Sequence, residues 1–271
     1  MNKPQVILTV VAILLVVGLY SLPKVVIDGG TPEEATFIDD SVPGGVMDHS
    51  TEIPEEFLPR INSWKSQLIV NDQIQLKPES LDSLMAVFIE INKYDSAAYY
   101  AELFAERFNE IDHWQKAGDA YYNAFTYALD KSKINMLVQK TRRAYDKVLA
   151  QEPNNLDVKH NVAMTYLAST SPMQGIMMLR EILDIDPKNL KTLFSMGIMS
   201  IDTNQYANAI ERFETLVEHY PDHVEGNFFL GISYYETGQM VKARTQFNKV
   251  KELGANEQTI TAADEYLERI S

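Results

Sequence analysis

Three prolines in the second half of the chain stand 34 residues apart, at Pro153, Pro187 and Pro221. Proline lacks a backbone N–H donor and biases the residue before it away from helical geometry, so each should follow the end of a helix. A fixed period of this length indicates that the chain stacks one helix-pair unit several times.

Two further columns of residues keep the same interval. A small residue in one helix beside a large residue in the next lets two antiparallel helices approach closely and still fill the space between them. The small column is Ala163, Gly197 and Gly231, and the large column is Leu179, Phe213 and Phe247.

The residues just after each proline suit a helix N-cap or the turn before it. The next helices are therefore predicted to begin near Asn155, Asn189 and Asp222 or His223.

These patterns resemble the tetratricopeptide repeat (TPR) family. The unit 224–257 matches the family signature best, with Leu230, Gly231, Tyr234, Gly238, Ala243 and Phe247. The units 156–189 and 190–223 match it with gaps: Ser200 replaces the signature tyrosine, and none of the three units has the signature tryptophan. The resemblance implies an all-α fold, a right-handed α-solenoid of TPR helix pairs.

An earlier unit, 112–155, carries an insert. Trp114 and Tyr121 resemble its first half and Tyr145 its second, but the stretch between them is eleven residues too long. Eleven residues make about three helical turns, so longer helices would absorb the insert without rotating the apolar face. A weaker first unit is predicted over 78–111.

Apolar stripes predict helices that cover the two ends of the stack. A capping helix is expected over 257–270, from Ala263, Tyr266, Leu267 and Ile270. At the other end, Phe57, Ile61, Trp64 and Leu68 form a similar stripe.

Residues 1–27 are predicted to be a membrane anchor. Val6 to Leu22 contains twelve Leu, Ile and Val residues and no charge, which suits one transmembrane helix. A cleaved signal peptide is the main alternative, but the run ends without a small-x-small cleavage site. A buried helix of a soluble protein is the second alternative. Lys3 and the amino terminus on one side, against Lys24 on the other, favour a cytoplasmic amino terminus. The expected location is a single-pass protein of a bacterial inner membrane, with the repeats on the periplasmic side.

Residues 28–59 are predicted to be a flexible linker, followed by the solenoid over 60–271. Until Pro59 the segment after Asp28 carries only acidic charge and is rich in Pro and Gly, so it should stay extended. It is interpreted as a spacer, with an acidic docking segment for a basic partner as the alternative.

The net charge of −14 argues against nucleic acid as a partner. One basic cluster lies in and after the insert and includes Lys133, Lys140, Arg142 and Arg143. It is interpreted as a solvated helix face, with a contact site for phosphate, lipid headgroup or an acidic segment as the alternative.

No catalytic, cofactor or metal site is predicted. The chain has no cysteine, which excludes thiol catalysis and thiolate metal sites. Pro221 separates His219 from His223, so these two are not expected on one helical face.

The resemblance implies that the first helices of successive units line a groove that binds proteins. Mapped onto this sequence, the groove positions of the last three units include His160, Met164, Lys191, Phe194, Ile198, Ile201, Phe228, Ile232 and Tyr235. Lys191 is the only Lys or Arg at the groove positions of these units, which gives no support to clamping of a carboxylate. The apolar residues suit a partner peptide or helix, unless neighbouring units or the linker cover them.

The sequence therefore predicts a non-catalytic, membrane-anchored adaptor or scaffold in cell-envelope assembly. The alternative is a cytoplasm-facing regulatory or nucleic-acid-associated factor that uses the basic insert.

Overall fold

The computed structural model describes residues 53–70, 73–74, 78–128 and 131–270. The predicted anchor and most of the predicted linker lie outside these residues. Within them, no helix combines the length and the apolar content needed to cross a membrane.

The described residues form helices joined by short turns, with one small hairpin. The elements are η1 (Glu55–Phe57), α2 (Leu58–Leu68), β1 (Ile69–Val70), β2 (Gln73–Ile74), α3 (Pro78–Glu90), α4 (Tyr94–Phe108), α5 (Ile111–Thr126), α6 (Lys131–Leu149), α7 (Leu156–Leu167), α8 (Pro172–Ile185), α9 (Leu190–Asp202), α10 (Tyr206–His219), α11 (Val224–Glu236), α12 (Met240–Glu252) and α13 (Glu257–Ile270). The antiparallel pair β1 and β2, with Ile69 opposite Ile74, is the one departure from the all-α prediction in this part of the chain.

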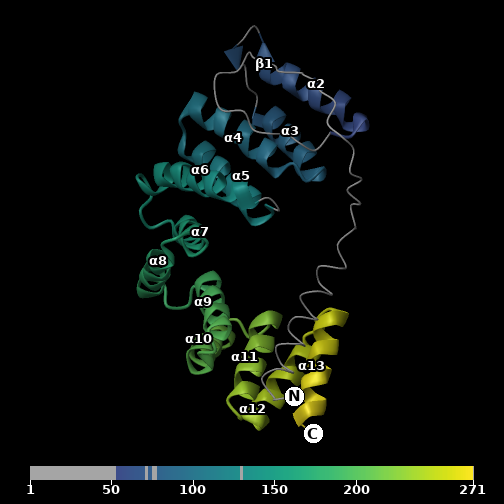
Figure 1. The fold of residues 1–271 in the computed structure, drawn as a ribbon, viewed down its shortest axis with the longest axis vertical. Coiled ribbons are helices and arrows are strands. Elements are labelled where there is room, and N and C mark those ends of the chain that lie inside the picture. Colours follow the sequence, from purple (N-terminus) through teal and green to yellow (C-terminus); the bar gives the residue numbers. More distant parts are fainter. Residues whose placement is uncertain (1–52, 71–72, 75–77, 129–130, 271) are drawn as a thin grey trace. The chain divides into compact units, whose positions relative to one another are not determined.

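Each helix packs against the next in chain order, as Figure 1 shows. The helix pairs are α3–α4, α5–α6, α7–α8, α9–α10 and α11–α12. The described part of the chain is thus a helical repeat.

The repeat period is fixed by the helix starts. The side chains of Asn155, Asn189 and His223 each accept a hydrogen bond from the backbone N–H three residues later, at 2.9–3.2 Å. These N-caps satisfy one otherwise unpaired donor at each start. Of the two candidates at the third start, His223 is the cap.

The turn inside two of the pairs also keeps the period. Asn204 and Gly238, 34 residues apart, adopt left-handed backbone angles with φ of 57° and 76°. Asparagine and glycine tolerate this region better than other residues, which lets the chain reverse between the two helices.

The small and large columns meet inside the pairs. A Cβ atom added at Gly197 would lie 2.5 Å from the Phe213 ring, and one at Gly231 would lie 2.8 Å from the Phe247 ring. Both rings are fully buried. The glycines therefore set how closely the paired helices approach.

The insert lengthens two helices, as predicted. α5 has 16 residues and α6 has 19, whereas the helices from α7 to α12 have 12 to 14. Tyr145 of α6 faces Gly118 of α5 as the later rings face their glycines.

Both ends of the stack are covered by helices. Ile61 of α2 packs with Leu84 and Phe88 of α3, and Tyr266 of α13 packs against the core of the last two pairs. η1 begins at Glu55 and α2 at Leu58, so the described helices include residues of the segment predicted as linker.

Candidate protein-binding surface

Six of the predicted groove residues lie on one side of α9 and α11. They are half-buried and pack against a common core that includes Phe213 and Phe247. The six are Phe194, Ile198, Ile201, Phe228, Ile232 and Tyr235. Apart from the hydroxyl of Tyr235 their side chains are apolar, and they recur at equivalent positions of successive units.

The aromatic members of this set also hold the repeats together. Phe194 contacts the rings of Phe213 and Phe229, with centroids 6.0 and 5.8 Å apart. Phe228 contacts Phe247 and Tyr266 in edge-on geometry. Each ring therefore has a structural role besides any contact with a partner. Neighbouring units cover part of each ring.

Lys191 is paired with a residue of the preceding unit. Its Nζ lies 2.6 Å from Oδ1 of Asp157, which occupies the equivalent position of α7. Both side chains are more than half exposed, so the ion pair sits at the surface and contributes little to stability.

His160 is buried rather than open to a ligand. It is 7% exposed, and its Nε2 lies 3.1 Å from Oγ of Ser195 on α9. Burial lowers the pKa of His160, because the charged imidazolium would lose its hydration. Met164, one turn further along α7, is half-buried.

The same surface continues onto α5, which the groove mapping left out. Asp112, Gln115 and Asp119 stand 45 residues before Asp157, His160 and Met164, which is the repeat of 34 plus the insert of eleven. Trp114 and Tyr121 carry the register that could have located them. We call the residues at these equivalent positions of α5, α7, α9 and α11 the first-helix face.

Asp119 is held by a side chain from the second helix of its unit. The hydroxyl of Tyr145 donates to Oδ1 of Asp119 at 2.7 Å and accepts from Nδ2 of Asn161 at 3.0 Å. Burial raises the pKa of Asp119, while the Tyr145 hydrogen bond and the Lys191 charge oppose this shift. A hydrogen-bond donor or a cation that reaches Asp119 would therefore stabilise its charged form.

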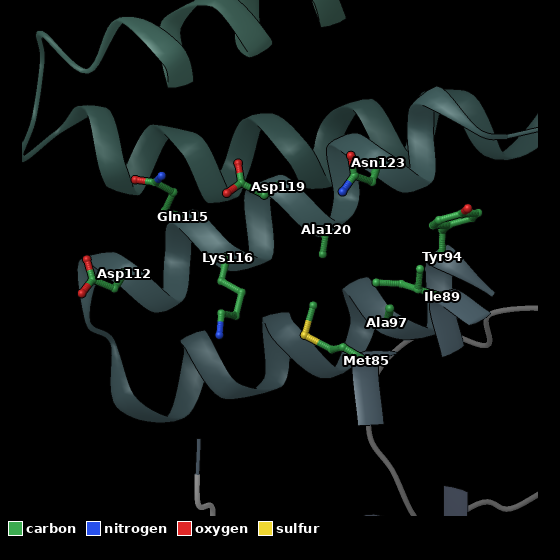
Figure 2. A pocket seen from close by; sticks show the side chains of 10 residues that line it. All are labelled: Met85, Ile89, Tyr94, Ala97, Asp112, Gln115, Lys116, Asp119, Ala120 and Asn123. Atoms are coloured by element: carbon green, nitrogen blue, oxygen red, sulfur yellow. The ribbon is translucent and has the colours of Figure 1, made fainter. Parts of the chain in front are cut away.

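A cavity of about 380 Å³ lies between α3, α4 and α5 beside this carboxylate. Figure 2 shows Met85 pointing from α3 toward Ala120 of α5, with Lys116 between the two helices. Lys116 donates to Asp82 at 2.5 Å. The cavity is thus lined by apolar side chains together with the charged groups of Asp112, Lys116 and Asp119.

Three residues of the basic cluster pair with acidic side chains of a neighbouring helix. Lys133 of α6 pairs with Asp95 at 3.3 Å, and Lys140 with the buried Glu102 at 2.6 Å. Arg143 pairs with Glu102 and with Glu106. These cations join α6 to carboxylates of α4, and they do not form a free basic surface.

Arg142 is also used internally. Its guanidinium lies 3.6 Å from the centre of the Tyr166 ring and donates to Oγ1 and to the backbone oxygen of Thr165, both at 2.8 Å. It therefore ties α6 to α7.

The described residues hold no group of three His, Asp or Glu side chains able to bind a metal ion.

Comparison with known proteins gives one family match, described as "Tetratricopeptide repeat", over residues 200–262. No match was found among curated proteins. Among solved structures, MamA 41-end from Desulfovibrio magneticus RS-1 is 18% identical and has a TM-score of 0.48, over 65% of this chain and 93% of that chain. YrrB, described as a TPR protein with an unusual peptide-binding site, is 14% identical with a TM-score of 0.45, over 78% of this chain and 98% of that chain.

The family match includes all of α10, α11 and α12. It contains the N-cap His223, the left-handed turn residues Asn204 and Gly238, and the contact of Gly231 with Phe247. Residues 200–262 therefore match the tetratricopeptide repeat family, within a fold of successively packed helix pairs.

Proposed function

We propose that the protein is a non-catalytic adaptor that binds a segment of a partner protein along the first-helix face. The observation that carries this proposal is the recurrence of half-buried apolar side chains at equivalent positions of α9 and α11. Covering their exposed area with an apolar peptide or helix would remove it from water, which stabilises a complex.

The proposal includes a single membrane anchor over residues 1–27. Its support is the uncharged apolar run from Val6 to Leu22 and the acidic, Pro- and Gly-containing segment that follows. The repeats would then act on the periplasmic side of a bacterial inner membrane, in assembly of the envelope. The cytoplasm-facing alternative relies on the basic insert, and the pairing of Lys133, Lys140 and Arg143 with α4 leaves it without a supporting observation.

The binding surface is tested with the full-length chain in its membrane. Serine at both Ile198 and Ile232 removes apolar area from the face without removing a ring that packs in the core. Serine at Val241, which is 81% exposed on α12, is the matched control. After chemical crosslinking and affinity capture, the double variant is expected to lose the partner that the wild type and the control retain. Equal recovery by all three, with unchanged thermal unfolding, would place binding elsewhere.

The anchor is tested separately. A reporter fused after Ser271 should be active only on the periplasmic side, and deletion of residues 1–27 should release the protein from the membrane fraction. A cytoplasmic reporter signal would reject the orientation, and an unchanged membrane fraction would reject the anchor.

A further inference from the structure

A second cavity, of about 420 Å³, opens at the junction between the units 156–189 and 190–223. Its apolar wall includes Leu167, Ile176 and Met199, and Ser200 of α9 also borders it. The cavity lies among α7, α8, α9 and α10, apart from the pocket of Figure 2.

The cavity lies where the chain lacks a tyrosine. Tyr166 and Tyr234 stand 34 residues before and after Ser200, and Tyr121 has the corresponding place in α5. Tyr121 and Tyr234 are buried, and Tyr166 is half-buried under Arg142. At Ser200 only a hydroxyl is present, and it donates to the backbone oxygen of Met196 in its own helix, at 2.8 Å. The space that a phenol ring fills in the other units is therefore left open at this junction.

One charge beside this position is also reversed. In the next unit, the hydroxyl of Tyr234 donates to Glu214, and Lys242 lies over the Tyr234 ring. The residue equivalent to Glu214 is Arg180, 34 positions earlier, and it borders the cavity. The carboxylate that accepts the tyrosine hydrogen bond in one unit is thus replaced by an arginine at the equivalent position of the other.

Two arginines border the cavity without a carboxylate partner. Asp202 also borders the cavity, but among the described residues no ion pair joins Arg180 or Arg212 to an acidic side chain, although the chain carries a net charge of −14. Arg212 donates through Nη1 to the backbone oxygen of Asn208 at 2.9 Å, but its Nε is buried and has no acceptor. A buried N–H without an acceptor is unfavourable, so this group favours a ligand that brings an oxygen.

We propose that this cavity is a second binding site, which takes an aromatic side chain of a partner protein together with a carboxylate next to it in the partner's sequence. The ring enters the space left by Ser200 and packs on Leu167, Ile176 and Met199. The carboxylate meets the guanidinium groups of Arg180 and Arg212, which bind carboxylates through paired donors. The ligand class is therefore an acidic segment that contains tyrosine or phenylalanine.

The outer side of α8 extends this site. Met173 and Met177 are 60% and 58% exposed, on the helical face next to that of Ile176 and Arg180. Exposed methionines adapt to different apolar partners, so residues that flank the inserted ring have a surface to contact. The site goes beyond the proposed function. It uses neither Ile198 nor Ile232, whose variants test that function, although Leu167 stands at the position equivalent to Ile201 of the first-helix face.

The test uses the full-length chain in lipid nanodiscs and the fluorescent peptide Ac-Glu-Asp-Tyr-Glu-Asp-NH2, with binding followed by anisotropy. Two control peptides carry Ala in place of Tyr, or Gln and Asn in place of Glu and Asp. Saturable binding of the first peptide is expected, with at least about tenfold weaker binding of each control, since a lost ring or charge contact of this kind is worth a factor of ten or more.

Two variants take the residues that the next unit has at the same positions. Ser200→Tyr should fill the cavity and weaken peptide binding at least about tenfold, with a melting temperature equal to or above that of the wild type. Arg180→Glu changes an exposed residue, so folding is preserved, and it should weaken binding similarly. Variants with serine at Ile198 and Ile232 should bind the peptide as the wild type does.

The proposal is overturned if the wild type binds the acidic tyrosine peptide no better than the two control peptides. It is also overturned if both Ser200→Tyr and Arg180→Glu bind it as the wild type does. If Ser200→Tyr fails to fold, Arg180→Glu alone decides.

Discussion

The hydroxyl of Tyr145 on α6 lies 2.7 Å from Oδ1 of Asp119 on α5, and it also accepts a hydrogen bond from Asn161 on α7. The ring of the same residue packs against Gly118. One side chain thus closes its own helix pair and joins it to the next unit. Its hydroxyl also holds the carboxylate of Asp119, which belongs to the first-helix face.

Replacement of Tyr145 by Phe should destabilise the protein while keeping the ring in place. The change leaves the half-buried Asp119 and Asn161 without their shared partner, which costs about 1–3 kcal/mol. Urea unfolding of the repeat domain measures this difference. Tyr127→Phe is the matched control. Because Tyr127 is 60% exposed, this variant should unfold with almost the same free energy as the wild type.

Replacement of Gly231 by Val should overpack the last helix pair. The new Cβ would lie 2.8 Å from the buried Phe247 ring, so the helices must separate. This should lower the free energy of unfolding by about 1–3 kcal/mol. Ala207→Val, at an exposed position of α10, controls for the helix propensity of valine. Equal midpoints of unfolding for the two variants would show that the glycine does not set the helix spacing.

Replacement of Lys140 by Met should be more harmful than a surface charge deletion. Glu102 is 5% exposed, and the change removes a cation 2.6 Å from its carboxylate. Breaking a fully buried ion pair costs about 3–5 kcal/mol. Because the Lys140 side chain is about a third exposed, we expect the free energy of unfolding to fall by about 2 kcal/mol. Lys116→Met, which breaks the more exposed pair with Asp82, should cost less than half as much in the same urea titration. A reversed order would contradict the structural role given to the α6 cations.

His160 should make stability depend on pH. Burial holds its folded-state pKa below the ordinary value of 6.5, so the unfolded chain binds the proton first as the pH falls. The stability contributed by neutral His160 is therefore complete above pH 6.5 and is lost as the pH falls from 6.5 toward the folded-state pKa.

His160→Gln tests this dependence by removing the titrating group. Between about pH 7.5 and 5.5, the free energy of unfolding of the variant should fall less than that of the wild type. Parallel pH profiles, measured by urea unfolding at each pH, would mean that His160 does not carry the effect.

The helix pairs of the last three units are predictable because their determinants are local. A cap, a small residue, a large residue and a proline recur at fixed spacing, and each acts on its own helix or on the adjacent one. Asn189 and Gly197 illustrate this, since each has the role that its column predicts.

The surface residues are harder to predict because their environments depend on contacts between units. The partners of Lys133 and Lys140 lie 38 residues earlier, on α4, so the sequence pattern alone does not distinguish an internal ion pair from a free basic patch. His160 occupies a groove position but is covered by α9. Asp119 was missed because the insert changes the spacing from 34 to 45.

Binding along the first-helix face is the central claim, and site-specific photo-crosslinking tests it most directly. A photo-reactive amino acid is placed at Tyr235, which is half-buried on the face, or at Val241, which is exposed on α12, in the full-length protein inside cells. One discrete crosslinked partner is expected from position 235 and none from position 241, and the product should be lost when Ile198 and Ile232 are serine. Equal products from both positions, or a product from position 241 alone, would contradict this claim.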